Sequence, residues 1–159
     1  MENKKKISLR DITCKNWKEC ISLKTEKLEE YPPLIYERYI ASNCLSLAQA
    51  KVEPLLKTKG IYLDDEMIGF TMFGYCEEKK FYEIYRIMID FKHQGCGYSK
   101  IAMKLIIAEM KNETNCKEMF VFVSPSNKIA INLYEAFGFK KMDKIVYSGE
   151  LTYLLLFNK

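Results

Sequence analysis

A short polar loop with two glycines, Gln94–Lys100, lies between two segments of different periodicity. Before it, Phe81–Ile89 is rich in aromatic and β-branched residues, which is typical of a buried strand. After it, apolar residues recur at helical spacing over Ile101–Met110, which predicts a helix. This order of elements directs free backbone N–H groups, and the positive end of the helix dipole, toward one point. The stretch therefore predicts either an anion-binding loop or a plain turn.

The residues of the loop restrict which anion it can hold. Gly95 and Gly97 have no Cβ, so a phosphate can approach the backbone closely, and Lys100 adds a positive charge. The P-loop pattern G-x-x-x-x-G-K-[ST] is absent. The dinucleotide fingerprint G-x-G-x-x-G also fails, because Lys100 stands where the third glycine should be. These departures argue against both types of nucleotide site.

The N-terminal third of the chain predicts one edge strand followed by short helices. The strand is Ile7–Ile12, and the helices are Asn16–Lys24, Leu34–Ala41 and Leu47–Glu53. Ser46 is the predicted cap of the last helix, and Pro54 ends it because proline cannot continue a helix.

The remainder of the chain reads mainly as strands. The predicted hairpins are Gly60–Asp64 with Met67–Tyr75, and Phe139–Tyr147 with Glu150–Phe157, while Glu118–Val123 is a continuous apolar run typical of a central strand. A helix follows the turn Ser124–Asn127 and ends at Gly138. The sequence therefore predicts one α/β domain over residues 1–159, with a mixed sheet of about six or seven strands.

Composition excludes several classes of function. The chain has 159 residues, of which 48% are hydrophobic and 29% charged, and no apolar run is long enough to span a membrane. The six cysteines are scattered and there is a single histidine, which argues against a metal site and a disulfide framework and favours a reducing cytoplasm. A net charge of +4, with dispersed lysines and arginines, does not indicate a nucleic-acid partner. No signal-peptide core follows the basic start, so we expect no export.

Three features together resemble the GNAT superfamily of acetyl-CoA-dependent N-acetyltransferases. Ile87–Asp90 followed by Gln94–Ser99 is similar to the family's Q/R-x-x-G-x-G/A pyrophosphate loop, although Ser99 stands where the family usually has Gly or Ala. Asn127–Phe139 resembles the signature N-x-x-A-x-x-L-Y-E-x-x-G-F, and the order of elements is the third feature. The resemblance covers nearly the whole chain, and it implies a GNAT-type mixed, largely antiparallel sheet flanked by helices.

A narrower resemblance is to the bacterial spermine/spermidine (diamine) N-acetyltransferase branch. It rests on Tyr85–Asp90, Gln94–Tyr98, Ser46–Ala50 and the ending Ser148–Leu151. It implies a cytoplasmic enzyme that acetylates a small polyamine, with a homodimer as the state that relatives often adopt. The alternatives are another amine acceptor, such as an aminoglycoside or a protein N-terminus, and a non-catalytic acyl-CoA-binding regulatory module.

The resemblance also assigns a cosubstrate, acetyl-CoA, and the residues that hold it. The backbone of Ile87, Met88 and Ile89 would pair with the pantetheine arm as an added strand does, and an N–H group near Met88 would stabilise the oxyanion. The remaining cofactor residues that the resemblance implies are Gln94, Gly95, Cys96, Gly97, Tyr98, Ser99 and Lys100 for the pyrophosphate, and Asn127, which can also cap its helix.

Two residues are candidates for proton transfer. By resemblance, Tyr134 gives a proton to the leaving thiolate, whereas its place on an apolar helix stripe reads as core. Glu83 is the candidate base, because it interrupts an apolar strand and lies on the same face as Ile89 by strand alternation. The alternatives to Glu83 as base are a solvated surface glutamate and a water chain to a backbone carbonyl.

The amine acceptor requires negative charge and aromatic faces near the reacting group. The N-terminal helical region supplies Glu30, Tyr31 and Glu53 as candidates, because this region forms the acceptor wall in GNAT proteins. Asp64, Asp65 and Glu66 are interpreted instead as an ordinary hairpin tip.

Overall fold

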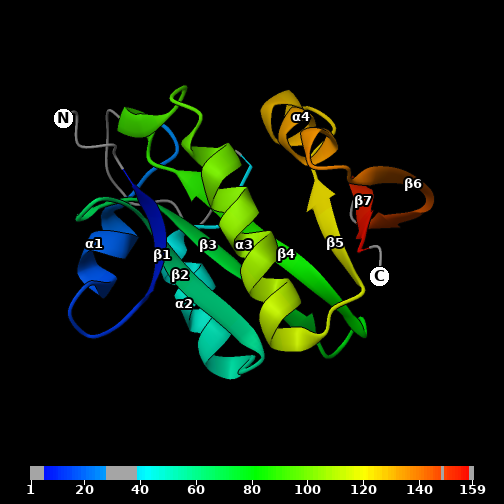
Figure 1. The fold of residues 1–159 in the computed structure, drawn as a ribbon, viewed down its shortest axis with the longest axis horizontal. Coiled ribbons are helices and arrows are strands. Elements are labelled where there is room, and N and C mark those ends of the chain that lie inside the picture. Colours follow the sequence, from blue (N-terminus) through cyan, green and yellow to red (C-terminus); the bar gives the residue numbers. More distant parts are fainter. Residues whose placement is uncertain (1–5, 28–38, 148, 158–159) are drawn as a thin grey trace.

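The computed structural model describes residues 6–27, 39–147 and 149–157, which form one seven-stranded sheet with helices on both faces (Figure 1). The order of strands across the sheet is β1-β2-β3-β4-β5-β7-β6. The strands are β1 (Ile7–Asp11), β2 (Leu56–Leu63), β3 (Glu66–Cys76), β4 (Phe81–Ile89), β5 (Glu118–Val123), β6 (Lys140–Tyr147) and β7 (Glu150–Leu156). The predicted mixed and largely antiparallel sheet is confirmed.

The sheet consists of two antiparallel parts that meet at one parallel junction. Strands β1 to β4 are antiparallel neighbours, and β5, β7 and β6 are antiparallel neighbours. At the junction, β4 and β5 run parallel and pair at Glu83 and Phe120. Beyond this pair the two strands separate, so the sheet is open between α3 and α4 (Figure 1).

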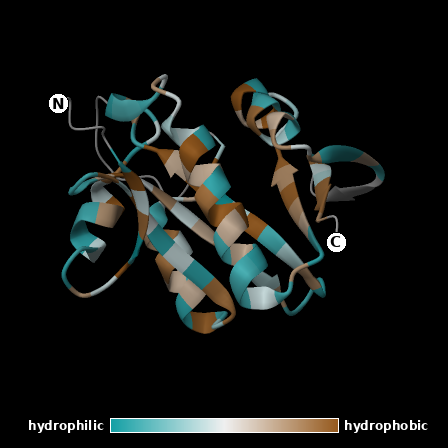
Figure 2. Cartoon of the chain, viewed as in Figure 1, coloured by the Kyte–Doolittle hydropathy of each residue, from teal (hydrophilic) through white to brown (hydrophobic). Residues whose placement is uncertain are grey.

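The helices cover the sheet on both faces. Helices α1 (Trp17–Ser22) and α2 (Asn43–Val52) pack on one face, in a cluster that includes Cys20, Met72 and Met88. Helix α3 (Tyr98–Thr114) and helix α4 (Lys128–Ala136) share the cluster on the other face. Figure 2 shows hydrophobic and hydrophilic residues alternating along α3, as an amphipathic helix requires. No helix in the described ranges combines the length and apolar character needed to cross a bilayer.

The predicted helices differ from the observed ones mainly at their starts. Helix α2 begins at Asn43 with Ser42 as its cap, because the Ser42 hydroxyl accepts a hydrogen bond from the Leu45 N–H at 3.3 Å. The predicted cap, Ser46, lies inside the helix and donates to the Ser42 carbonyl at 3.0 Å. Helix α3 begins at Tyr98 rather than at residue 101. Most of the predicted helix 34–41 lies outside the described residues.

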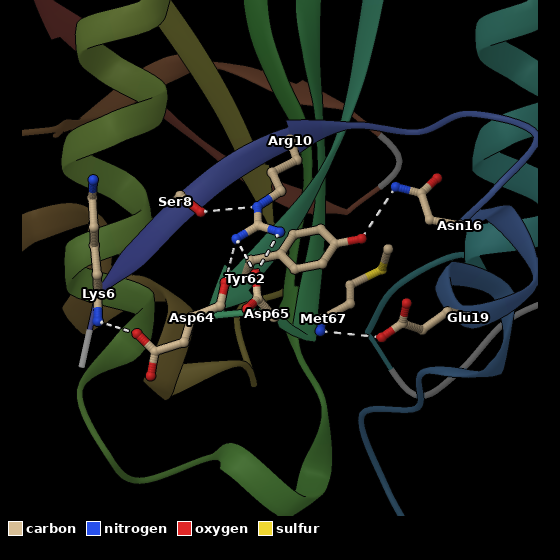
Figure 3. Close-up of polar contacts among 9 residues, drawn as sticks. All are labelled: Lys6, Ser8, Arg10, Asn16, Glu19, Tyr62, Asp64, Asp65 and Met67. Carbon is tan, nitrogen blue, oxygen red and sulfur yellow. Dashed lines mark hydrogen bonds and ion pairs between the residues drawn. The ribbon is translucent and has the colours of Figure 1, made fainter. Parts of the chain in front are cut away.

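The turn between β2 and β3 anchors β1 and α1 to the sheet (Figure 3). The Arg10 guanidinium contacts the Asp64 carbonyl and the Asp65 carboxylate, and it lies 4.3 Å from the centroid of the Tyr62 ring. On the other side, Glu19 of α1 accepts a hydrogen bond from the Met67 N–H at 3.1 Å. Asp64 and Asp65 lie at the tip of the hairpin, as the sequence predicted, and their contacts with Arg10 and Lys6 give them a structural role that the sequence did not indicate.

A β-bulge interrupts the alternation of side chains along β4. Arg86 pairs with Met72 and Ile84 pairs with Phe73, so Tyr85 has no partner on β3. Ile84 and Ile89 both pack on the face that α3 covers. Because Glu83 is adjacent to Ile84, it points to the opposite face. The prediction that Glu83 shares a face with Ile89 is therefore wrong, since unbroken alternation does not account for a bulge.

The close approach of β3 and β4 requires a glycine at position 69. A Cβ added at Gly69 would lie 2.4 Å from the Met88 carbonyl oxygen, which belongs to the backbone and cannot rotate away. We expect Gly69→Ala to lower the free energy of unfolding by ~1–3 kcal/mol, because the two strands must move apart. Urea denaturation monitored by circular dichroism measures this change.

Gly60→Ala is the matched control on the neighbouring strand. A Cβ at Gly60 would lie 2.9 Å from Tyr62 Cε2 and 3.0 Å from Met67 Cε, which are side-chain atoms and not backbone atoms, and the Met67 methyl is the end of a flexible side chain. We expect this variant to lose less than about 1 kcal/mol. Equal losses in the two variants would contradict the backbone clash.

Candidate active site

The separation of β4 and β5 opens a cavity of ≈ 1010 Å³. Its walls come from β4, the loop before α3, the end of β5, and α4. The lining includes Glu83, Tyr85, Arg86, Ile87, Met88 and Ile89 of β4, Gln94, Gly95, Gly97, Tyr98 and Ser99 of the loop and helix start, and Phe122, Val123, Asn127 and Tyr134 on the far side. The structure therefore brings the two predicted motifs to opposite walls of one cavity.

The edge of β4 presents unpaired backbone groups to this cavity. The Asp90 N–H donates to the Ile68 carbonyl on β3 at 2.8 Å. Because backbone groups alternate in direction along a strand, Met88 also faces β3, whereas Ile87 and Ile89 face away from it. The Ile89 carbonyl accordingly accepts a hydrogen bond from the Gln94 side chain at 3.0 Å. The edge of β4 beside the cavity can thus pair with an extended ligand.

The loop before α3 has the geometry that a phosphate requires. Gly95 and Gly97 both have φ of 78°, in the left-handed region that disfavours other residues, and the space beside their Cα atoms is open. Gly97 is the N-cap of α3, so Tyr98 and Ser99 form the first turn, where N–H groups have no partner from the preceding turn. Helix α3 is 17 residues long, and its dipole adds positive potential at this point.

Not every predicted loop residue faces the cavity. Cys96 and Lys100 are exposed, and neither lines the cavity wall. The Gln94 amide nitrogen donates to two carbonyls, those of Thr25 at 2.9 Å and Ile89 at 3.0 Å. Gln94 therefore braces the loop, and its side-chain oxygen is the atom left for a ligand.

Asp90 is a supporting residue that the sequence reasoning did not identify. Its buried carboxylate accepts one hydrogen bond from the Lys24 N–H at 3.0 Å and another from the Lys92 N–H at 3.1 Å. These bonds join the end of β4 to the segment after α1 and to the start of the loop. An acidic residue directly after a buried strand was the available signal, since such a carboxylate needs partners.

Tyr134 projects from α4 toward the cavity and is 6% exposed. Burial raises the pKa of its phenol to about 12, and the negative charges of Glu150 and Glu83 add to this shift. The phenol therefore keeps its proton at neutral pH. Asn127 caps α4, since its side-chain oxygen accepts a hydrogen bond from the Ala130 N–H at 3.2 Å, and it also lines the cavity.

Glu83 is buried, not solvated, and lies at the point where β4 and β5 last pair. Its Oε2 atom accepts a hydrogen bond from Lys79 Nζ at 3.0 Å. Burial raises the pKa of the Glu83 carboxyl, and this effect outweighs the opposite effect of Lys79 and Arg86. Arg86, on the same strand, donates a hydrogen bond from its Nη1 atom to the Tyr85 carbonyl at 2.8 Å.

The part of the cavity around Glu83 contains residues that the sequence reasoning missed. Lys79, Glu150 and Gln49 line it together with Tyr85 and Phe122. They come from a turn, a hairpin and a helix that are distant in sequence, so no local pattern joins them. Glu53 is not among the lining residues, and its carboxylate instead accepts a hydrogen bond from Gln49 Nε2 at 2.9 Å. The other two predicted acceptor residues, Glu30 and Tyr31, lie outside the described residues.

Comparison with known proteins shows which family this chain is similar to. The model of the acetyltransferase (GNAT) family matches residues 14–139. A spermine/spermidine N(1)-acetyltransferase of Bacillus subtilis strain 168 is 31% identical over 118 residues, which cover 70% of this chain and 78% of that protein.

Two solved structures have the same fold. A chimera of the Vibrio cholerae spermidine N-acetyltransferase SpeG and hSSAT aligns with a TM-score of 0.70 at 16% identity, covering 94% of this chain and 95% of that one. The PaiA N-acetyltransferase of Thermoplasma acidophilum, solved in complex with coenzyme A, aligns with a TM-score of 0.68 at 14% identity, covering 96% of this chain and 99% of that one. The family match, the curated relative and the fold agree, and the chain belongs to the GNAT family as an acetyl-CoA-dependent N-acetyltransferase.

Proposed function

We propose that the protein transfers the acetyl group of acetyl-CoA to a primary amine of a small polyamine. The observation that carries this proposal is the composition of the cavity beside Tyr134. Carboxylates of Glu83, Glu150 and Glu26 line it together with the aromatic rings of Tyr85 and Phe122. Carboxylates and aromatic faces both attract alkylammonium groups. The similarity to a spermine/spermidine N(1)-acetyltransferase supports the same acceptor class.

In this proposal acetyl-CoA enters between β4 and β5. The edge of β4 at Ile87 and Ile89, which does not pair with β5, holds the pantetheine arm by backbone hydrogen bonds, as an added strand would. The N–H groups at Gly95, Gly97 and the start of α3 hold the pyrophosphate. Ser99 lies in the first turn of α3 and lines the cavity, so its hydroxyl can donate to the same phosphates. Asn127 binds from the opposite wall.

The chemistry proceeds by direct transfer. Glu83 accepts a proton from the acceptor ammonium, and the neutral amine attacks the thioester carbonyl, forming the new C–N bond. A backbone N–H group beside Met88 stabilises the tetrahedral oxyanion. The C–S bond then breaks, and Tyr134 gives its proton to the leaving thiolate. The attacking nitrogen, which is positively charged in the intermediate, loses its second proton, and this proton restores the Tyr134 phenol. The raised pKa of Tyr134 keeps that proton available until the thiolate forms.

We further propose that residues 1–159 act as one GNAT domain. The family match ends at residue 139, before β6 and β7. However, β7 pairs with β5 from Leu156 opposite Glu118 to Leu151 opposite Val123. Glu150, at the start of β7, also lines the cavity. The last two strands therefore support both the sheet and the proposed acceptor wall.

Thiol release from acetyl-CoA with a panel of amines tests the proposed acceptor. The panel contains spermine, spermidine, putrescine, kanamycin and a short peptide. We expect turnover with the polyamines and little with kanamycin or the peptide, because carboxylates beside the rings of Tyr85 and Phe122 favour an ammonium on a flexible alkyl chain over one on a sugar ring or at a peptide N-terminus. Preferred turnover with kanamycin or the peptide would assign another amine. Binding of acetyl-CoA without turnover of any amine would favour a non-catalytic acyl-CoA-binding module.

Tyr134→Phe tests the proton donor. We expect kcat to fall roughly 100-fold, because the thiolate loses its proton source, while the Kd of acetyl-CoA is unchanged. Stopped-flow thiol detection and calorimetry measure the two quantities. Tyr153→Phe is the control, because this buried phenol donates to Glu135 at 3.0 Å and does not line the cavity. An unchanged kcat in Tyr134→Phe would refute the assigned role.

The pH dependence of kcat/KM tests Glu83 as the base. Only the ionised carboxylate accepts a proton, and burial raises the pKa of Glu83, so kcat/KM should rise as the pH increases through that pKa. We expect Glu83→Gln to lower kcat/KM by roughly 100-fold and to lose this part of the profile. The ionisation of the amine remains in both profiles.

Glu150→Gln separates proton transfer from charge attraction, because Glu150 lines the same cavity. This variant should raise KM for the amine while the shape of the pH profile is kept. Identical profiles for the wild type and Glu83→Gln would exclude Glu83 as the base.

A further inference from the structure

Lys79 lies in the turn 77–80 between β3 and β4, and its side chain lines the acceptor side of the cavity. The turn is held at Cys76, whose carbonyl accepts a hydrogen bond from the Lys80 N–H at 2.8 Å and whose Sγ accepts one from the Lys79 N–H at 3.4 Å. The backbone of Lys79 is thus fixed at the rim, while its four-carbon stem carries the charge inward.

The end of this side chain occupies a site built from a carboxylate and aromatic rings. Lys79 Nζ lies 3.0 Å from Glu83 Oε2 and 4.4 Å from the centroid of the Phe122 ring. The rings of Phe81 and Tyr85 are each 5.7 Å from the same nitrogen. The Glu83 side chain is 6% exposed. A cation over an aromatic face with a desolvated carboxylate beside it is a favourable site for an alkylammonium group.

The group bound there is chemically the same as the end of a polyamine, because a lysine side chain terminates in a primary alkylammonium. We propose that Glu83 and Phe122 form a binding subsite for a primary alkylammonium group, and that Lys79 fills this subsite until an acceptor amine displaces it. The identification of the incoming ligand as the acceptor rests on the proposed function. The subsite itself rests on the contacts of Lys79.

This arrangement makes Lys79 an intramolecular competitor of the acceptor. A tethered group competes with an effective concentration set by its short stem, so it reduces the apparent affinity of any free amine. The competitor also discriminates by charge, since a neutral amine or an alcohol cannot replace the ammonium beside Glu83. Lys79 is therefore a specificity-determining residue, because it sets the minimum affinity that an acceptor must have.

Calorimetric binding of n-butylammonium and of spermidine, without acetyl-CoA, tests the subsite directly. We expect Lys79→Met to bind both cations roughly 10-fold more tightly than the wild type, because the competitor is removed while an apolar stem of similar length remains. Lys79→Gln is a second variant with the same expectation. Lys79→Arg retains a cation at the subsite and should bind neither ligand more tightly.

Lys80→Met is the matched control, because Lys80 is exposed and belongs to the same turn. It removes one positive charge from the same region. Any gain in cation affinity that both variants show is therefore due to the loss of a positive charge and not to the release of the subsite. Phe122→Leu, placed in the Lys79→Met background, should reverse most of the gain by removing the aromatic face. Circular dichroism confirms the fold of each variant.

Affinities of Lys79→Met and Lys79→Gln equal to or weaker than that of the wild type would overturn the subsite. A gain equal to that of Lys80→Met would also overturn it. Failure of the proposed function has a different signature: the thiol-release panel then shows no polyamine turnover, while the gain in cation binding at the subsite persists.

Discussion

Beyond the pair formed by Glu83 and Phe120, β4 and β5 no longer bond to each other, and the site depends on this separation. The bulge at Tyr85 gives β4 one residue more than β3 over the same length, which increases the local twist and bends the strand. The backbone groups of Ile87 and Ile89 consequently face the cavity instead of β5. Because such groups are costly to bury without partners, the same distortion that opens the sheet also prepares an edge for an extended ligand.

Negative charge within the cavity affects both the phenol of Tyr134 and any ammonium group that enters. The chain has a net charge of +4, but carboxylates of Glu83 and Glu150 lie near Tyr134. Negative charge disfavours a phenolate, so these carboxylates help to raise the pKa of Tyr134. The same charges favour the entry of ammonium groups. In the proposed reaction, one local arrangement thus keeps the proton on Tyr134 and attracts the amine, which the net charge of the chain does not indicate.

Periodicity and turn residues were sufficient to predict the elements that are locally encoded. Strand β4 was predicted with its observed bounds, as was β5, because each is rich in aromatic and β-branched residues and lies between polar segments. Asn127 marked the start of α4 for reasons that apply within a few residues, whereas α3 begins at Tyr98, before the predicted start at residue 101. Ser42 was missed as a cap because Ser46 also precedes a helical pattern, and only the hydrogen bond to Leu45 distinguishes the two serines.

Features of the site that depend on residues distant in sequence could not be predicted from local patterns. The face of Glu83 depends on the bulge, which is a property of the pairing between β3 and β4 and not of either strand alone. Lys79 and Glu150 reach the cavity from two separate hairpins, and each reads locally as surface charge. The helical pattern indicated that Tyr134 belongs to the core, and the structure shows that this residue is buried and also lines the cavity, as a proton donor would have to.

The ion pair between Glu83 and Lys79 helps to explain how a buried carboxylate can stay ionised, as a general base must. An isolated carboxylate in a desolvated site is costly, and it would take up a proton and lose its ability to act as a base. With Lys79 beside it, at 3.0 Å, part of that cost is offset before any acceptor is bound. In the proposed exchange an acceptor ammonium replaces the lysine ammonium, so the carboxylate faces one cation until it takes the proton of the acceptor. The difference between the two cations is that the acceptor is free to leave once its nitrogen is acetylated and has lost its charge.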